Sequence, residues 1–369
     1  MGTRIPAEVF PPGELLKEEL EARNWSQIEF AEIIGKDTRL VYEVINGKRV
    51  ITPETASILG EALGTSAHVW MNLESQYQLS KVRDSNGSVS KKARLHTKFP
   101  VRDMVKRNWI KSAKSAEAIE NQIFTFFGIG SIDQEIDFPH AAKKTAQGQT
   151  PIQQLAWLFR VREIAKTMFV NEFSAVSLIG SLTDLSALTS APEEARHAAR
   201  ILANCGVRLV FVEPLAGSRI DGVCFWLDDG PVIGMALRFD RIDNFWFVLR
   251  HEIEHVLKGH GRKSFYLDQD VDGADSISDE EVQANKAAAD FCVPEVEMQD
   301  FFDRVSPYFY EQKVLLFAQR IGVHPGLVVG QLHRRLGRHD LLKKHQVKIR
   351  YLVIPSTATD GWGQQFPID

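Results

Sequence analysis

Five residues in the second half of the sequence, His251-Glu252-Ile253-Glu254-His255, place two imidazoles four positions apart with a carboxylate beside the first. Positions i and i+4 share one face of a helix, so both imidazoles can bind a single zinc ion. Glu252 lies next to the first ligand, where it can take a proton from water that the metal activates. The pattern therefore predicts a zinc site with His251 and His255 as ligands and Glu252 as the general base of a hydrolase.

The residues around this motif indicate a buried helix beside a small sheet. The segment "DNFWFVLRHEIEHVL" is apolar on much of its helical surface, as an active-site helix inside a domain should be. Branched and aromatic residues bounded by Gly, Pro and Asp predict strands at 208–213, 222–227 and 231–239. The segment 112–205 favours helices. We expect a mainly α fold with a small β-sheet, in the α+β class.

Three blocks of the sequence resemble the ImmA/IrrE family of zinc metallo-endopeptidases. "LANCGVRLVFVEPLAGSRIDGVCFWLDDGPVIGMALRFDRIDNFWFVLRHEIEHVLKGH" is similar to the family's approach to its HExxH helix. "VQANKAAADFCVP" is similar to the family signature E-A-N-x-F-A-A-x-x-L-x-P, and "IGVHPGLVVGQLHRR" follows in family order. The resemblance covers about residues 150–340. It implies a zincin-like fold, a Zn²⁺ cofactor and cleavage of a protein substrate.

The third zinc ligand is where the sequence departs from the family pattern. Counting back from Pro294, the family's glutamate falls on Gln283, whose neutral amide lacks the charge that complements a dication. Glu280, three residues earlier on nearly the same helical face, is the alternative ligand, and we expect Glu281 to point to a different side. A site without a carboxylate favours a second interpretation, a zincin domain without hydrolysis that acts as a sensor or as a scaffold for a toxin or another protein.

The first 80 residues predict a chain of short helices. Ser26 is a good N-cap for a helix that Gly35 closes, and a second short helix follows from Asp37 to about Ile45. Two short helices joined by a tight glycine turn form the helix-turn-helix arrangement. Later helix starts are indicated by Thr52-Pro53 and by Thr65 or Ser66.

This region resembles the Xre-type helix-turn-helix of the HigA/VapI antitoxin branch over about 70 residues, because "INGKR" and "ITPETA" occur together in order. The resemblance implies a lambda-repressor-like domain of five helices that binds double-stranded DNA, with "DTRLVYEVI" as the helix in the major groove. Base contacts would come from Thr38, Arg39 and Tyr42. Phosphate contacts would come from Gln27, Asn46, Lys48 and Arg49, and Lys36 would add to the basic patch.

The net charge of −4 conceals a segregation along the chain. Residues 81–111 hold ten Lys and Arg against two Asp and Glu, whereas the segments on both sides are acidic. We predict a basic linker at 81–111, which could contribute phosphate contacts, between a helix-turn-helix domain at 1–80 and a zincin-like domain at 112–369.

The composition excludes several classes of protein. No apolar run approaches the roughly 18 residues that span a bilayer, and three cysteines without CxxC spacing suit a reducing compartment. We expect a cytoplasmic homodimer with no membrane contact. Its leading function is that of an antitoxin-like, DNA-binding transcriptional regulator whose zinc-dependent endopeptidase domain cleaves a regulatory protein; the alternative is a catalytically inactive zincin domain that senses a signal or binds a toxin.

Overall fold

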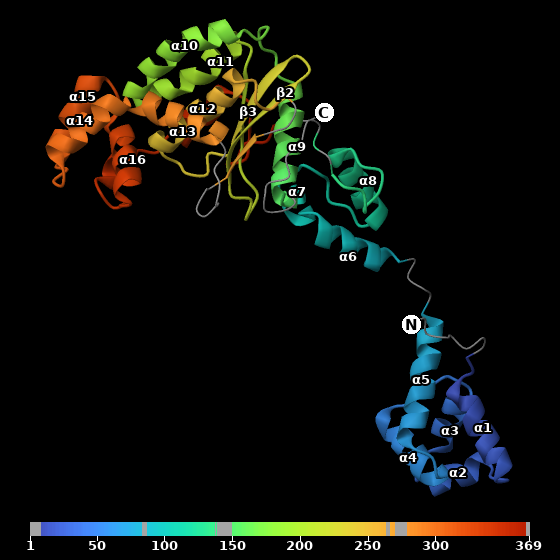
Figure 1. The fold of residues 1–369 in the computed structure, drawn as a ribbon. Helices are drawn as coiled ribbons and strands as arrows, with labels where there is room; N and C mark the ends of the chain where they lie inside the picture. Colours follow the sequence, from blue (N-terminus) through green and yellow to red (C-terminus); the bar gives the residue numbers. More distant parts are fainter. Residues whose placement is uncertain are drawn as a thin grey trace. The chain divides into compact units, whose positions relative to one another are not determined.

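The computed structural model describes residues 9–82, 87–136, 138, 150–262, 266–269 and 279–366, and the chain divides into two compact units (Figure 1). Unit 1 is Met1–Val89 and unit 2 is Ser90–Asp369. Among the described residues, no helix is both long enough and apolar enough to cross a membrane.

The described part of unit 1 contains five complete helices: α1 (Pro12–Ala22), α2 (Gln27–Ile33), α3 (Thr38–Ile45), α4 (Pro53–Leu63) and α5 (Ala67–Lys81). The predicted caps are confirmed at three of the starts. Ser26 forms a capping box with Glu29, Asp37 accepts from the backbone N–H of Arg39, and Thr52 accepts from that of Thr55. These bonds satisfy N–H groups that the first helical turn leaves open, which is why each helix begins where it does.

The core of unit 1 holds the helix-turn-helix pair in place. Ala31 on α2 and Val41 on α3 are fully buried where the two helices cross, and Gly35 takes a φ of +63° in the turn between them. Gly13 of α1 lies against the end of α3, where a Cβ would be 2.3 Å from the carbonyl oxygen of Val44. The packing therefore fixes α3 from behind and leaves its opposite face to solvent.

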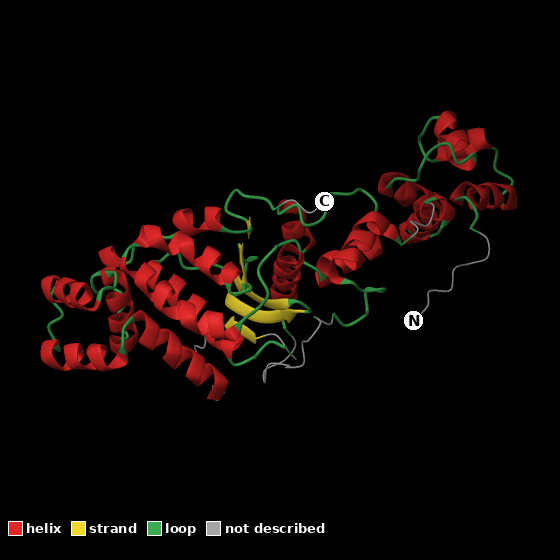
Figure 2. Cartoon of the chain, turned by 90° about the horizontal axis from the view of Figure 1, so that it is seen from above, coloured by secondary structure: helices red, strands yellow, loops and turns green. Residues whose placement is uncertain are grey.

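Unit 2 contains a five-stranded sheet in the order β4-β2-β3-β1-β5 among the described residues, and its strands lie between helices in Figure 2. The strands are β1 (Arg208–Val212), β2 (Ile220–Leu227), β3 (Gly230–Met235), β4 (Tyr266–Gln269) and β5 (Thr359–Asp360). β1 is parallel to β3 and β5, whereas β2 is antiparallel to β3 and β4. The predicted strands at 208–213 and 222–227 are confirmed, and so is the α+β class; the third predicted strand, 231–239, is confirmed only as far as Met235.

Alternate residues of β1, β2 and β3 enter two different cores, one on each face of the sheet. Leu209 and Phe211 belong to the core that contains α12 (Ile242–Leu257), whereas Val210 and Val212 belong to the core that contains α9 (Ile152–Lys166). The other long helices of unit 2 are α8 (Ala116–Phe127), α10 (Ala175–Ala187), α11 (Ala198–Asn204), α13 (Asp279–Cys292), α14 (Glu295–Val305), α15 (Glu311–Ile321) and α16 (Pro325–Leu336). The sheet is thus a central layer with helices on both faces.

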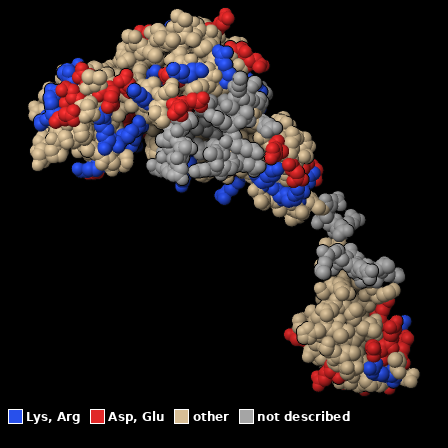
Figure 3. Space-filling view, in the orientation of Figure 1, with Lys and Arg blue, Asp and Glu red and all other residues tan. Residues whose placement is uncertain are grey.

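The predicted basic linker is wrong from residue 90 onward. Residues 88–98 form α6 and 101–106 form α7, and Leu95, Met104 and Trp109 are buried in the core of unit 2. The charge count did not reveal the apolar face of this segment, because the basic side chains lie on its outer face. Lys91, for example, pairs with Glu120 at 2.6 Å within the unit. Basic and acidic side chains lie close together over this part of the surface in Figure 3.

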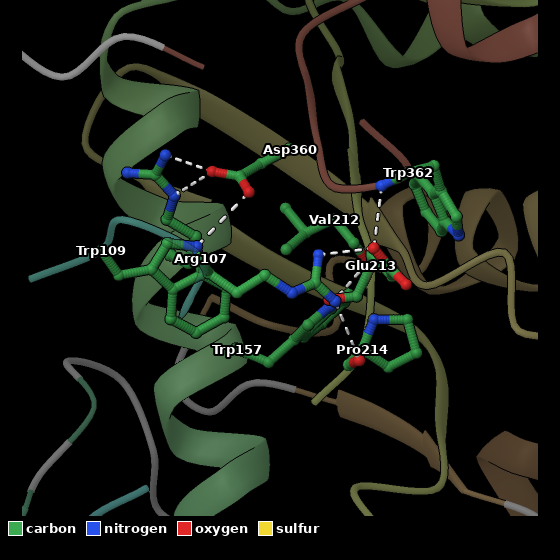
Figure 4. Close-up of polar contacts among 9 residues, drawn as sticks. Arg107, Trp109, Trp157, Val212, Glu213, Pro214, Asp360 and Trp362 are labelled. Atoms are coloured by element: carbon green, nitrogen blue, oxygen red, sulfur yellow. Dashed lines mark hydrogen bonds and ion pairs between the residues drawn. The ribbon is translucent and has the colours of Figure 1, made fainter. Parts of the chain in front are cut away.

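The C-terminal segment is tied to the sheet by a buried ion pair (Figure 4). Asp360 of β5 pairs with Arg160 of α9, and both side chains are almost completely buried. The indole Nε1 of Trp109 lies 3.4 Å from the same carboxylate, while Arg107 pairs with Glu213 at 2.6 Å. These contacts join α9, the segment after α7 and β5, which are distant in sequence, so they stabilise the edge of the sheet.

Candidate metal centre and nucleic-acid interface

Helix α12 (Ile242–Leu257) carries the HExxH residues into the interior of unit 2. His251 and Glu252 are 0% exposed and His255 is 1% exposed. The helix packs on β2 and β3 on one side and on α13 on the other, because apolar residues occupy most of its circumference. The prediction that this segment is a buried helix is confirmed.

Three side chains bring ligand atoms together at this point: His251, His255 and Glu281. The Nε2 atoms of the two histidines are 3.0 Å apart, and the Glu281 carboxylate oxygens lie 3.3 Å from His251 Nε2 and 3.5 Å from His255 Nε2. Ligands at 2.0–2.1 Å from a tetrahedral zinc ion are separated by about 3.3 Å. The two histidine–glutamate distances, which involve different oxygens of the carboxylate, lie near this value, and the distance between the histidines is slightly shorter. The three groups are therefore close enough together to hold a zinc ion.

The expected third ligand, Gln283, is not at this site, and the expectation that Glu281 points to a different side is also wrong. Gln283 is exposed on α13, whereas Glu281 shares the face of the buried Ala284 and Ala288 at spacings of three and seven residues. Those alanines allow α13 to pack closely on α12, and the same face directs the Glu281 carboxylate at the two histidines. The family signature predicts which helix supplies the carboxylate, but not which position of that helix faces the histidines.

Glu280, the alternative ligand, lies in a second layer around the site. Its carboxylate is 3.8 Å from Nε2 of His260, and the Nδ1 of His260 is 2.9 Å from the Nδ1 of His255. His260 is held in turn by its carbonyl oxygen, which accepts a hydrogen bond from the indole of Trp226 at 2.8 Å. Metal-binding imidazoles are commonly oriented by a partner on the other ring nitrogen, and His260 has that position for His255.

Burial and charge set the protonation of the cluster. Burial, followed by the charge of His251, lowers the pKa of His255 to about 3. Burial alone would raise the pKa of Glu281, but the hydrogen bond and charge of His251 and the charge of His255 outweigh it, so that its pKa is lowered. Near neutral pH the site presents a neutral imidazole and an ionised carboxylate, which are the forms that coordinate a cation.

Glu252 lies on the sheet side of α12, against β2. A Cβ on Gly222 would be 2.3 Å from Glu252 Oε1 and 2.9 Å from the side chain of Val248, so only glycine leaves room for this carboxylate. Burial and the charge of Glu252 raise the pKa of Cys224 well above its usual value, so this thiol stays protonated. Gly222 was not identified from the sequence, although an isolated glycine inside a strand pattern is a known sign of close approach.

In unit 1, the residues predicted to contact DNA surround α3. Lys36, Thr38, Arg39, Tyr42, Asn46, Lys48 and Arg49 are exposed, whereas Gln27 at the start of α2 is half-buried. Lys48 Nζ lies 5.4 Å from the centre of the Tyr42 ring, and Asn46 Nδ2 donates to the Tyr42 carbonyl oxygen at 2.8 Å. The structure thus places these side chains on one surface, which we call the α3 surface.

Glu43 lies within the α3 surface and was missed in the sequence. Its two carboxylate oxygens accept hydrogen bonds from the Nε atoms of Arg39 and Arg49, each at 2.8 Å. The hydrogen bond from Arg39 is the main cause that lowers the pKa of Glu43. Exposed pairs of this kind are weak because solvent screens them, so both guanidinium groups can exchange Glu43 for another anion. The spacing of four residues between Arg39 and Glu43 is the signal that could have revealed the pair.

Comparison with known proteins gives similarities to helix-turn-helix proteins. A family model described as helix-turn-helix matches residues 16–70. An uncharacterised HTH-type transcriptional regulator of Escherichia coli, YddM, is 31% identical over 86 residues, which are 23% of this chain and 90% of that protein.

Solved structures with similarity include three bacterial proteins. A putative antidote protein of a plasmid maintenance system from Nostoc punctiforme is 36% identical, over 20% of this chain and 81% of that one, with a TM-score of 0.20. The Pseudomonas aeruginosa antitoxin HigA with the higBA promoter is 32% identical, over 22% and 88% of the two chains, with a TM-score of 0.21. PA4674 of the same organism, in complex with operator DNA, is 31% identical over 22% and 89%, with a TM-score of 0.21.

Proposed function

We propose, from the premise that this chain belongs to the helix-turn-helix family, that unit 1 binds double-stranded DNA and that the protein regulates transcription. The observation that carries the proposal is the α3 surface, where the predicted contact residues are exposed together on a helix that is packed from behind. The "INGKR" and "ITPETA" motifs favour an antitoxin-type regulator, and a chromosomal operator would place it in the cytoplasm. We further propose that it binds as a homodimer, since such modules read paired half-sites.

The contacts that α3 can make differ along the surface. Thr38, Arg39 and Tyr42 lie on the helix itself, so they would meet base edges in the major groove. Lys48 and Arg49 follow the helix and would meet phosphates, as would Asn46 at its C-cap and Gln27 at the start of α2. Lys36 precedes α3 and adds positive charge to the surface. Arg39 must leave Glu43 to reach a base, and the weak exposed pair permits this.

Titration of fluorescent DNA with the full chain tests these assignments. Using the DNA upstream of the gene and a scrambled duplex, Arg39→Ala should reduce the ratio of specific to non-specific affinity, whereas Lys48→Ala should weaken both alike and lower the salt dependence by about one unit. Lys17→Ala is the matched control, because Lys17 is an exposed cation on α1 outside the α3 surface. Equal affinity of the wild type for both duplexes would contradict sequence-specific binding.

For unit 2 we propose a zincin-like domain of ImmA/IrrE type that holds one Zn²⁺ through His251, His255 and Glu281. The support is the convergence of the three groups: the two Nε2 atoms are 3.0 Å apart, one carboxylate oxygen of Glu281 lies 3.3 Å from His251 Nε2, and the other lies 3.5 Å from His255 Nε2. Such an ion supplies Lewis acidity that lowers the pKa of water and polarises a peptide carbonyl. His260 orients the His255 ring from its far nitrogen.

Glu252 is the residue that we propose as proton acceptor in peptide hydrolysis. It follows His251 directly on α12, and the lack of a side chain at Gly222 gives its carboxylate space beside β2. An ionised carboxylate takes a proton from the attacking water and can return it to the leaving amine. The site is then that of a metallo-endopeptidase that cleaves a regulatory protein.

The alternative is an inactive zincin domain that acts as a sensor or as a scaffold for a toxin. It was favoured because Gln283 left the site without a third carboxylate, but Glu281 supplies a carboxylate beside the two histidines, so this argument no longer applies. Glu252→Gln discriminates between the two proposals, since an amide cannot accept a proton. With zinc-loaded protein and candidate regulatory proteins as substrates, the variant should keep its zinc and lose cleavage. Equal cleavage by wild type and variant would exclude Glu252 as the base, and absence of cleavage by the wild type would favour the scaffold.

A further inference from the structure

A cavity in unit 2 contains chemistry that neither proposal uses. It has a volume of about 520 Å³ and lies between the N-terminal turns of α12, the end of α13 and α16. None of His251, His255 and Glu281 lines it. Asp243, which does line it, is eight residues before His251, or about 12 Å along the helix.

Asp243 is the buried polar group of this cavity, with a residue exposure of 9%. Its Oδ2 accepts hydrogen bonds from Arg241 at 3.2 Å and from Gln346 at 3.1 Å. Its Oδ1 is buried and makes no hydrogen bond to any residue that the structure describes. Burial raises the pKa of this carboxyl group, and the charge of Arg241, the backbone N–H groups of Asn244 and Asp243 and the charge of His333 oppose the shift. Oδ1 can accept a hydrogen bond from a ligand, and a neutral N–H or O–H is enough because Arg241 already offsets the charge.

The contacts of Asp243 are fixed by neighbouring groups. His333 is buried, its Nδ1 lies 3.3 Å from the Gln346 amide, and its Nε2 lies 2.6 Å from the carbonyl oxygen of Leu341. On the other side, a Cβ at Gly330 would lie 2.6 Å from Asp243 Oδ2. The carboxylate is therefore held in one orientation, as a recognition group should be.

The mouth of the cavity is cationic. Arg334 is exposed on α16 with its guanidinium 3.8 Å from the centre of the Phe247 ring. This guanidinium favours an anionic group at the mouth.

The walls between the acidic base and the cationic mouth are apolar. Phe247 and Leu327 line the cavity together with Cys292, whose pKa is raised to about 12 by burial and then by the charge of Asp243. The thiol is protonated and behaves as a small apolar group.

We propose that this cavity binds a small organic anion that has an apolar or aromatic body and an N–H or O–H donor at the end away from its negative charge. The donor meets Asp243 Oδ1, the body lies along Phe247 and Leu327, and Arg334 meets the anion. The volume accommodates a ligand of this kind. The anion can be a carboxylate, as in an amino acid, or a phosphate, as in a nucleotide. This inference does not depend on the zinc proposal.

Two probes distinguish a carboxylate ligand from a phosphate ligand. L-Tryptophan has a carboxylate and an indole N–H, and adenosine 5′-monophosphate has a phosphate and an exocyclic amino group. Calorimetric titration of the full chain at millimolar ligand should detect at least one of them. 1-Methyl-L-tryptophan and N6,N6-dimethyladenosine 5′-monophosphate lack the donor and should bind about ten-fold or more weakly than their parents. This comparison leaves the protein unchanged, so it does not depend on the folding of any variant.

Protein variants locate the binding. Arg334→Met should weaken the bound probe about ten-fold, and Asp243→Asn should remove most of the preference for the unmethylated form. Arg335→Met is the matched control, because Arg335 is the next residue on α16 but pairs with Glu295 at 2.6 Å and does not line the cavity. Tryptophan binding alone supports a carboxylate ligand, and nucleotide binding alone supports a phosphate. Binding of neither probe, equal binding of the methylated forms, or equal loss in Arg334→Met and Arg335→Met would overturn the proposal.

Discussion

Substitution of Glu281 by glutamine is the sharpest test of how the HExxH site is completed. The change keeps the length of the side chain and removes its charge, while His251 and His255 remain as they are. Structural zinc sites bind with about 10–16 kcal/mol, so each of four ligands contributes about 2.5–4 kcal/mol. Glu281 is partly accessible, with a side-chain exposure of 21%, so that water and the new amide recover part of this. We expect a loss of about 2–3 kcal/mol, which is about a 30- to 150-fold increase in Kd.

Competition for zinc against a chromophoric chelator measures this change directly. Gln283→Ala is the matched control, because Gln283 is two residues further along α13 and exposed, and it should leave the Kd unchanged. Gln283→Glu should likewise change little, since its new carboxylate would face solvent. The reasoning is refuted if Glu281→Gln binds zinc like the wild type, or if a change at Gln283 alters the affinity by the amount expected for Glu281.

Three further predictions concern residues that support the candidate metal site, the Glu252 side chain and the sheet. His260→Ala should raise the Kd for zinc about 10- to 100-fold in the same competition, because His255 loses the group that orients its ring, and an unchanged Kd would remove His260 from the site. Gly222→Ala should lower the free energy of unfolding, measured in urea, by about 1–3 kcal/mol because the new methyl group clashes with Glu252. The control is Gly180→Ala on α10, where a Cβ meets nothing within 4 Å, and this change should be neutral or stabilising. Similar effects of the two changes would contradict the close approach of Gly222 and Glu252. Asp360→Asn should cost about 3–5 kcal/mol in the same measurement because it leaves Arg160 buried without its counter-charge, and a loss below about 1 kcal/mol would show that the pair is dispensable.

The helix-turn-helix could be predicted almost residue by residue because its signals are local. An N-cap such as Ser26 acts on backbone groups two or three positions away, and Gly35 acts on its own φ, so neither depends on the rest of the fold. The exposed face of α3 then follows from helical periodicity. Glu43 was not identified, although its partners Arg39 and Arg49 lie within six residues.

The candidate metal site could be predicted only in part. His251 and His255 share one helix, so their spacing fixes their relative position. The carboxylate that joins them, Glu281, comes from another helix, and which residue of α13 faces the histidines depends on how α13 is rotated against α12, which the buried Ala284 and Ala288 decide. Residues 88–111 show a similar limit: ten basic side chains dominate the charge count of 81–111, yet Leu95 and Met104 determine which unit the segment joins.

Metal analysis of the purified chain tests the central claim about unit 2 most directly. The account predicts about one zinc per chain in protein prepared without chelators, and loss of that zinc in His255→Ala, because a site left with one imidazole and one carboxylate loses most of its affinity. Wild-type protein that is free of metal and takes up no added zinc, or a His255→Ala variant that retains a full equivalent, would contradict it.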